Sequence, residues 1–380
     1  MKEVGLYIHI PFCKRKCHYC DFYSICDVDS ELIDSYFKTL QQEIEEVGMS
    51  SENLIVKTVY IGGGTPSIID DKYITNIMKT IYSSFKLIDS PEITIEVNPG
   101  TVTENKLKSY KDSGINRLSI GMQSANDTLL KEIGRIHSWA DFVECYKFAR
   151  EVGFNNINVD CMIGLPMQTK DDVKNTIKEI SILNPEHISV YSLIIEEGTR
   201  MEAMVNENKE LLPDEDKERA MYWETKRYLE SNGYKQYEIS NFSKPGYESK
   251  HNLDCWHQKE YIGFGPGAHS YTDGIRYSNV SNVKEYIKCY EENRQEDSII
   301  IHEKQDKTAM AKEFIMLSLR TLEGCNKDEF YKKFKYDLEK GFKSEIEKLE
   351  KLDLIENTKT HIKLTDKGLD LANIVWEEFV

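Results

Sequence analysis

The chain has 380 residues, of which 40% are hydrophobic and 30% charged, and its formal net charge is -16. This acidity argues against non-specific nucleic-acid binding, which needs clustered Lys and Arg to neutralise phosphates. No apolar run is long enough to span a bilayer, and no secretory or twin-arginine start is visible. We therefore expect a cytoplasmic protein with one large domain and one or two smaller ones. Its 9 cysteines should be ligands or core residues rather than a disulfide framework.

Three thiols crowd a short segment directly after the β-rich run at residues 6–10. Cys13, Cys17 and Cys20 are spaced so that their thiolates can converge on one corner of an inorganic cluster. No fourth ligand follows locally, and Cys26 lies further out. This pattern favours a four-iron cluster with one iron open for an exchangeable ligand. A zinc knuckle completed by His9 or His18, a disulfide with a spare thiol, and buried structural cysteines remain open as alternatives.

The first half of the chain alternates strand and helix signals. Strand patterns occupy residues 6–10, 58–61, 92–97, 117–120, 156–163 and 187–193. Helix patterns occupy residues 30–47, 71–85 and 104–111, a pair that ends at 152, and a segment that starts near 169. Strand-then-helix units joined by short turns require right-handed parallel crossovers. The sequence therefore predicts an α/β fold in which a parallel sheet curls into a partial (β/α)6 barrel.

Polar or ligand-type residues stand where these strands end, and the carboxyl ends of barrel strands meet at one rim. The second strand is followed by a glycine-rich turn, in which the missing Cβ atoms let the backbone approach a ligand's amino and carboxylate groups. For each residue a structural role as a cap, a surface carboxylate or a strand-end acceptor stays open. We expect the following residues to line one mouth: Cys13, Gly63, Glu96, Gln123, Asp160 and Ser192.

Beyond the barrel pattern the chain changes character. We expect a helix at 214–230, a strand at 236–239, and an aromatic, glycine-rich loop region at 247–271 that covers the mouth. Helices at 309–319, 328–334 and 342–354, with a hairpin at 355–364, resemble a winged-helix α+β module. Its mixed Lys and Glu favour a solvated or protein-facing surface over a DNA-binding one. The expected division is a core domain at 1–233, a connecting, mouth-covering region at 234–300 and a C-terminal domain at 301–380.

The cysteine loop followed by the glycine-rich turn resembles the radical S-adenosylmethionine (SAM) superfamily. The stretches 7–12, 96–100, 119–124, 134–137 and 160–166 look like the oxygen-independent coproporphyrinogen oxidases and their relatives. That resemblance implies a [4Fe-4S] cluster on Cys13, Cys17 and Cys20. It also implies that Tyr7 packs beside the bound nucleoside and that SAM contacts Gly64, Thr65 and Glu96. Around a second SAM or the substrate, it implies Gln123, Arg135, Asp160 and Ser192, of which Arg135 suits a carboxylate partner.

Two departures from the oxidase pattern point to another branch. Cys20 is followed by Asp21 and Phe22 rather than by one more residue and a fourth cysteine, and the first strand begins almost at Met1. With the stretch 251–256, which holds Cys255 where tyrosine is usual, these features resemble the haem chaperone branch called HemW. The resemblance implies haem binding and transfer to an acceptor protein, a membrane-bound acceptor included. The alternative is radical-SAM decarboxylation of coproporphyrinogen, and an enzyme acting on nucleic acid is disfavoured by the charge.

A haem function asks for an axial ligand, for which imidazole is a common choice. His251 is the first candidate, with the alternative that it is hydrogen-bonded in a turn and merely positions Asn252 and Trp256. His269 is the second candidate, with the alternative that it belongs to the SAM cavity. Cys255 reads as a small buried thiol rather than as an iron ligand.

Overall fold

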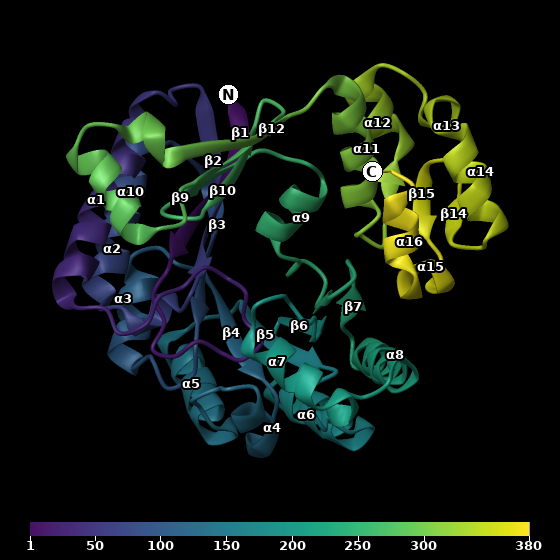
Figure 1. Ribbon diagram of the computed structural model, residues 1–380, viewed down its shortest axis with the longest axis horizontal. Helices are drawn as coiled ribbons and strands as arrows, with labels where there is room; N and C mark the ends of the chain where they lie inside the picture. Colours follow the sequence, from purple (N-terminus) through teal and green to yellow (C-terminus); the bar gives the residue numbers. More distant parts are fainter. Residues whose placement is uncertain (380) are drawn as a thin grey trace.

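Six parallel strands form the centre of the larger domain in the computed structural model, which describes residues 1–379 (Figure 1). In β1, Val4, Leu6 and Ile8 are buried in the helix-covered core, so the alternate residues Gly5 and Tyr7 point into the barrel. The predicted partial (β/α)6 barrel is confirmed. The strands are β1 (Lys2–Ile10), β2 (Leu54–Gly63), β3 (Leu87–Val97), β4 (Arg117–Gln123), β5 (Ile157–Ile163) and β6 (His187–Ser192).

Helices cover the outside of these strands, and their ends follow local capping chemistry. Ser138 and Thr169 each form a capping box with the aspartate three residues later. Asp29 caps the first helix by accepting a hydrogen bond from the Leu32 N–H. The helices are α1 (Ser30–Met49), α2 (Asp71–Ser84), α3 (Glu104–Asp112), α4 (Asp127–Glu132), α5 (Trp139–Val152), α6 (Lys170–Leu183), α7 (Arg200–Glu207), α8 (Glu215–Ser231) and α10 (Val283–Glu291), with 3-10 turns at Pro66–Ile68, Lys209–Leu211 and Gln295–Ser298.

The barrel strands belong to a 12-stranded sheet that the residues 234–304 extend on both edges. β9 (Tyr261–Phe264) pairs parallel with β1, and β10 (His269–Thr272), β11 (Ile275–Asn279) and β12 (Ile299–Lys304) continue antiparallel. On the other edge β8 (Asn241–Ser243) pairs with β6 and β7 (Lys235–Gln236) follows. Every residue of the edge strand β12 is exposed, including three consecutive isoleucines, Ile299 to Ile301.

A buried carboxylate fastens the extension to the barrel. Glu43 of α1 accepts hydrogen bonds from the Gly265 N–H (2.8 Å), Asn279 Nδ2 (2.6 Å) and the Tyr286 hydroxyl (2.5 Å). Burial raises the pKa of Glu43 to about 7, although these three donors oppose the rise. One side chain of α1 thus ties together β9, β11 and α10.

The segment expected to cover the mouth lies elsewhere. Its helix α9 (Lys250–Trp256) packs on β2, and its first residues contact Thr58 and Glu92 well before their strands end at Gly63 and Val97. Figure 1 shows α9 between the barrel sheet and the C-terminal domain. The helix α9 therefore lies in the barrel interior beneath the mouth, and the mouth-covering expectation is wrong for this helix.

The C-terminal residues form a second, smaller core that includes Phe330, Phe334 and Ile362. Arg320 joins the two domains, since its guanidinium lies 4.5 Å from the ring centre of Trp256 and 4.6 Å from that of Trp376. The elements are α11 (Lys307–Ser318), α12 (Lys327–Phe334), α13 (Leu338–Gly341), α14 (Lys343–Lys351), α15 (Asp366–Asp370) and α16 (Ala372–Glu377), with the sheet strands β13 (Cys325–Asn326), β14 (Ile355–Asn357) and β15 (His361–Leu364). Within residues 1–379 no helix is long and apolar enough to cross a bilayer.

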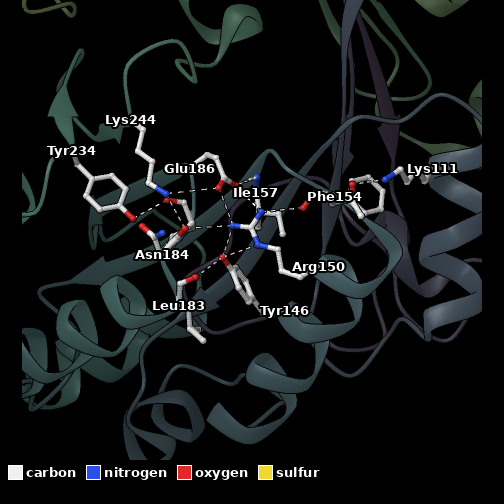
Figure 2. A network of polar contacts seen from close by, with 12 residues as sticks. Lys111, Tyr146, Arg150, Phe154, Ile157, Leu183, Asn184, Glu186, Tyr234 and Lys244 are labelled. Atoms are coloured by element: carbon white, nitrogen blue, oxygen red, sulfur yellow. Dashed lines mark hydrogen bonds and ion pairs between the residues drawn. The ribbon is translucent and has the colours of Figure 1, made fainter.

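A polar network on the outside of the barrel connects α5 to the start of β6 (Figure 2). The Glu186 carboxylate lies 2.8 and 3.0 Å from the two terminal guanidinium nitrogens of Arg150, and it accepts a hydrogen bond from the Ile157 N–H at 3.1 Å. Arg150 in turn donates to the Tyr146 hydroxyl, and Lys244 lies 3.8 Å from Glu186. Because the Glu186 side chain is only 12% exposed, its removal leaves donors that water reaches poorly.

We predict that Glu186→Ala lowers the free energy of unfolding by about 2 kcal/mol, because a partly buried guanidinium loses its bidentate partner. Urea unfolding followed by circular dichroism measures this change. Glu224→Ala is the matched control, since Glu224 makes only an exposed 3.9 Å ion pair with Lys170 and should leave the transition nearly unmoved. Equal shifts for both variants would contradict the prediction.

Candidate functional site

A cavity of about 390 Å³ opens at the carboxyl ends of the barrel strands. The cysteine loop after β1, the glycine turn after β2 and the ends of β3 to β6 enclose it. It brings together most of the residues expected at the mouth and in the deeper cavity. These are Cys13, Cys17, Cys20, Gly63, Gly64, Thr65, Glu96, Gln123, Arg135 and Asp160.

The three thiols of the cysteine loop share this cavity. Burial raises the pKa of the Cys20 thiol to about 11, and the neighbouring Cys17 and Cys13 add to the rise. Across residues 1–379 no three Cys, His, Asp or Glu side chains already stand in metal-holding geometry. The donor set, three thiols facing one cavity without a fourth side-chain ligand, fits an iron–sulfur core with one open position.

Both histidines considered for a zinc knuckle have structural partners. His18 Nδ1 lies 2.9 Å from the Glu132 carbonyl oxygen, and His9 bonds the Tyr7 hydroxyl and the Tyr23 carbonyl, each at 3.0 Å. Burial lowers the pKa of His9 to about 4, so its imidazole is neutral. These bonds fix the strand and loop around the thiols. They occupy both ring nitrogens of His9, which argues against His9 as a fourth zinc ligand, whereas His18 Nε2 has no hydrogen-bond partner.

The glycine turn brings backbone against the cysteine loop. A Cβ on Gly64 would lie 2.7 Å from the Phe12 carbonyl oxygen and 3.0 Å from Cys13 Sγ, so only glycine fits. Thr65 Oγ1 lies 3.5 Å from the same sulfur. The turn therefore leaves a narrow cradle, lined by backbone, between the thiols and the cavity.

Glu96 is the carboxylate at the centre of the cavity wall. It accepts hydrogen bonds from the Tyr60 hydroxyl (3.0 Å) and the Gly63 N–H (3.2 Å). Burial and, next, repulsion by Asp160 raise the pKa of Glu96 to about 7. Burial likewise raises the pKa of Asp160, which Asn158 and Ser119 hold by hydrogen bonds. Two buried carboxyl groups facing one cavity suit a cationic ligand, such as one carrying an ammonium or a sulfonium group.

Arg135 lines the cavity but already has partners. Its guanidinium donates to Asn98 Oδ1 (2.7 Å) and the Gly121 carbonyl (2.5 Å), and Nη1 lies 3.7 Å from Cys17 Sγ. Asn98 in turn donates to Thr65 Oγ1 at 3.0 Å. Arg135 therefore holds the cysteine loop against the glycine turn, where the sequence suggested a ligand carboxylate as its partner.

Four expected site residues lie outside the cavity lining. Tyr7 stands behind Tyr60, with ring centres 6.3 Å apart, and His251 is buried deeper in the barrel. His269 is exposed at the start of β10. Ser192 was expected to line the cavity, but the strand register places it on the opposite face. Asp160 pairs with Ser189, so the cavity-facing residue at the end of β6 is Tyr191.

Sequence reasoning also missed cavity residues that carry no motif of their own. Tyr60, Ser119 and Tyr191 line the cavity from β2, β4 and β6. The register pairs Glu96 with Ser119 and Asp160 with Ser189, and alternation along β6 then places Tyr191 on the cavity side, but this register is visible only in the structure. Asn98 stands in a stretch that the sequence had singled out, but only the structure shows its contact with Arg135.

Comparison with known proteins agrees with this geometry. Residues 7–180 match the radical SAM superfamily and residues 305–371 match the HemN C-terminal domain. The chain is 38% identical to the heme chaperone HemW of Bacillus subtilis (strain 168) over 98% of both chains. It is 36% identical to the heme chaperone HemW of Lactococcus lactis subsp. lactis (strain IL1403) over 100% of this chain and 98% of that one.

A solved structure shares the complete fold. Coproporphyrinogen III oxidase (HemN) from Escherichia coli superposes with a TM-score of 0.86 over 100% of this chain and 90% of that one, at 23% identity. That identity is low enough that the likeness concerns the fold. Radical SAM membership implies a [4Fe-4S] cluster and SAM as cofactors, and the cavity offers thiols and carboxyl groups for both. By near full-length identity to its named members, the chain belongs to the heme chaperone HemW family of radical SAM proteins.

Proposed function

We propose that this protein is a haem chaperone, which binds haem together with a [4Fe-4S] cluster and SAM and hands the haem to an acceptor protein. The observation that carries the proposal is the 38% identity over 98% of the chain to a protein named as a heme chaperone. The second candidate, coproporphyrinogen oxidation, has the shared fold of the E. coli oxidase in its favour, at 23% identity. Fold alone does not assign chemistry.

The cluster site in this proposal is the cysteine loop, with Cys13, Cys17 and Cys20 as ligands. Gly64, Thr65 and Glu96 would hold SAM beside the open iron, and Gln123, Arg135 and Asp160 would shape the deeper cavity. Their common position around one cavity of about 390 Å³ supports this arrangement. When bound, the cluster supplies an electron and SAM supplies a cleavable sulfonium.

Accessibility favours His269 over His251 as the haem iron ligand. His269 is exposed, and its ring stacks on that of His302 with centres 5.2 Å apart. Burial and the neighbouring His302 lower the pKa of His269, which favours the neutral imidazole that binds iron. His269 pairs with Ser278, and Ser278 pairs with Ile300, so Ile300 lies on the same face of the sheet and would offer a porphyrin an apolar contact. His251, by contrast, is buried, and its Nδ1 is bonded to Thr58.

Cys17→Ala should abolish the charge-transfer absorption of the reconstituted cluster and most of the bound iron, because two thiolates cannot hold the four-iron core. Iron content and visible spectra of the anaerobically reconstituted protein measure this. Cys26→Ala is the control, since Cys26 is absent from the cavity lining, and it should keep full iron. An unchanged iron content in the Cys17→Ala protein would contradict the assignment of Cys17 as a cluster ligand.

SAM affinity should fall as the pH drops from about 7.5 to about 6. The pKa of Glu96 is raised to about 7 in the free protein, so at lower pH this carboxyl group is protonated and must release a proton to meet a cation. Well below the pKa of Glu96, SAM affinity should fall by about tenfold per pH unit. Equilibrium dialysis with labelled SAM gives the slope, and Glu96→Gln should flatten it. An equally steep slope in Glu96→Gln would assign the titration to another group.

The chaperone proposal predicts that the reconstituted protein binds haem and passes it to an apo acceptor without converting coproporphyrinogen. Haem titration followed by absorption should show that the haem affinity of the His269→Ala variant is lower by about tenfold or more. His361→Ala, in the C-terminal domain, is the matched control and should match the unmodified protein. Many turnovers of coproporphyrinogen decarboxylation by the reduced protein with SAM would overturn the chaperone proposal and favour the oxidase.

A further inference from the structure

The stretch 251–256, which the haem candidates leave without a role, forms α9 and is anchored at both ends. Glu92 accepts hydrogen bonds from the Lys250 N–H (3.1 Å) and the His251 N–H (3.0 Å) at its start. Asp254 forms a 2.7 Å ion pair with Lys57 of β2. At the end of the helix, Trp256 packs on Arg320, which belongs to the C-terminal domain side. These contacts fix where the helix directs its side chains.

The anchored helix holds the His251 ring inside the barrel. Nδ1 lies 2.8 Å from Thr58 Oγ1, and the ring is only 7% exposed. Burial lowers its pKa to about 4, so the imidazole is neutral and carries no charge into the interior. A Cβ on Gly5 would lie 3.3 Å from the ring, which shows how closely β1 approaches it.

The ring of Tyr60 has two aromatic neighbours. His251 lies on it with centres 5.3 Å apart and planes 30° apart, and Tyr7 stacks on it at 6.3 Å and 29°. The Tyr60 hydroxyl donates 3.0 Å to Glu96, the carboxylate of the cavity wall. A continuous set of contacts therefore runs from α9 through Tyr60 to the group that would meet the cation of SAM.

We propose that His251 is a positioning residue for the SAM cavity, which holds Tyr60 so that its hydroxyl orients Glu96, and that it is not a haem ligand. The proposal rests on SAM binding by this cavity, as put forward above. Offering the imidazole to a porphyrin would require α9 to leave Glu92, Lys57 and Arg320. Holding Tyr60 requires no movement at all, because the contacts already exist.

The test compares His251→Ala with His251→Phe in the reconstituted full-length protein. Phe keeps a ring against Tyr60 but has no nitrogen for iron, whereas Ala removes both. We expect SAM affinity, measured by equilibrium dialysis, to fall about tenfold in His251→Ala and to stay near that of the unmodified protein in His251→Phe. Haem affinity, measured by absorption titration, should be unchanged in both variants.

Tyr60→Phe supplies a second measurement, because it deletes only the hydroxyl that bonds Glu96. If His251 acts through Tyr60, the loss of SAM affinity in the double variant His251→Ala, Tyr60→Phe should be smaller than the product of the single losses. Electron paramagnetic resonance of the reduced cluster should also show a weaker SAM-induced change in both single variants. Iron content and circular dichroism confirm that the compared proteins are loaded and folded.

Three results would overturn this proposal. Loss of haem affinity in both His251 variants with SAM affinity intact would make His251 an iron ligand. Fully multiplicative losses in the double variant would separate His251 from Tyr60. Equal SAM affinity in His251→Ala and the unmodified protein would remove the positioning role while leaving SAM binding in place. A failure of the unmodified protein to bind SAM would instead refute the proposed function itself.

Discussion

The barrel interior contains many polar side chains, and their need for hydrogen-bond partners constrains the rest of the structure. Burying a polar group without a partner costs free energy, so most side chains that point inward form hydrogen bonds, although Thr94 Oγ1 and Arg117 Nε do not. His187 illustrates the solution, since Nδ1 bonds Asn158 at 2.6 Å and Nε2 bonds the Tyr237 hydroxyl at 2.7 Å. Tyr237 lies beyond the six barrel strands, as does His251, the partner of Thr58. The chain after β6 therefore completes the interior of the barrel.

At the mouth of the barrel, the stability of the protein and the binding of a cationic ligand place opposite requirements on the carboxyl groups. Glu96 and Asp160 are partly buried carboxyl groups with raised pKa values, and the charge of Asp160 adds to the rise at Glu96. A structure selected for stability alone would pair them with a cation of its own. The protein does this in part for Asp160, because the charge of the buried Arg117 lowers its pKa, whereas the cavity-lining Arg135 donates to Asn98 and Gly121. Glu96 accepts hydrogen bonds only from the neutral Tyr60 hydroxyl and the Gly63 N–H, and within residues 1–379 it forms no ion pair, so its carboxyl group stays available to a cationic ligand.

Local patterns predicted the barrel because each strand and helix carries its own periodicity and caps, and the cysteine spacing predicted the loop that borders the cavity. The prediction that Ser192 lines the cavity was wrong because the sequence of one strand does not show which of its residues face the cavity. The pairing of Asp160 with Ser189 supplies that information. The strands β9 and β10 were not predicted because each is only four residues long and becomes recognisable as a strand only through its pairing with neighbouring strands. Tyr60 reads in sequence as an ordinary strand residue, and only contacts from distant segments reveal its setting.

The sheet that forms the barrel does not close, so its last strand, β12, leaves a row of backbone donors and acceptors free along one side. Ile299, Ile300 and Ile301 make this edge apolar, and such edges tend to join one another. The net charge of -16 keeps molecules apart near neutral pH. Near the isoelectric point of about 5.2 that repulsion disappears. Colloidal stability of this protein therefore depends on its acidic surface, and mildly acidic buffers expose it to edge-to-edge aggregation.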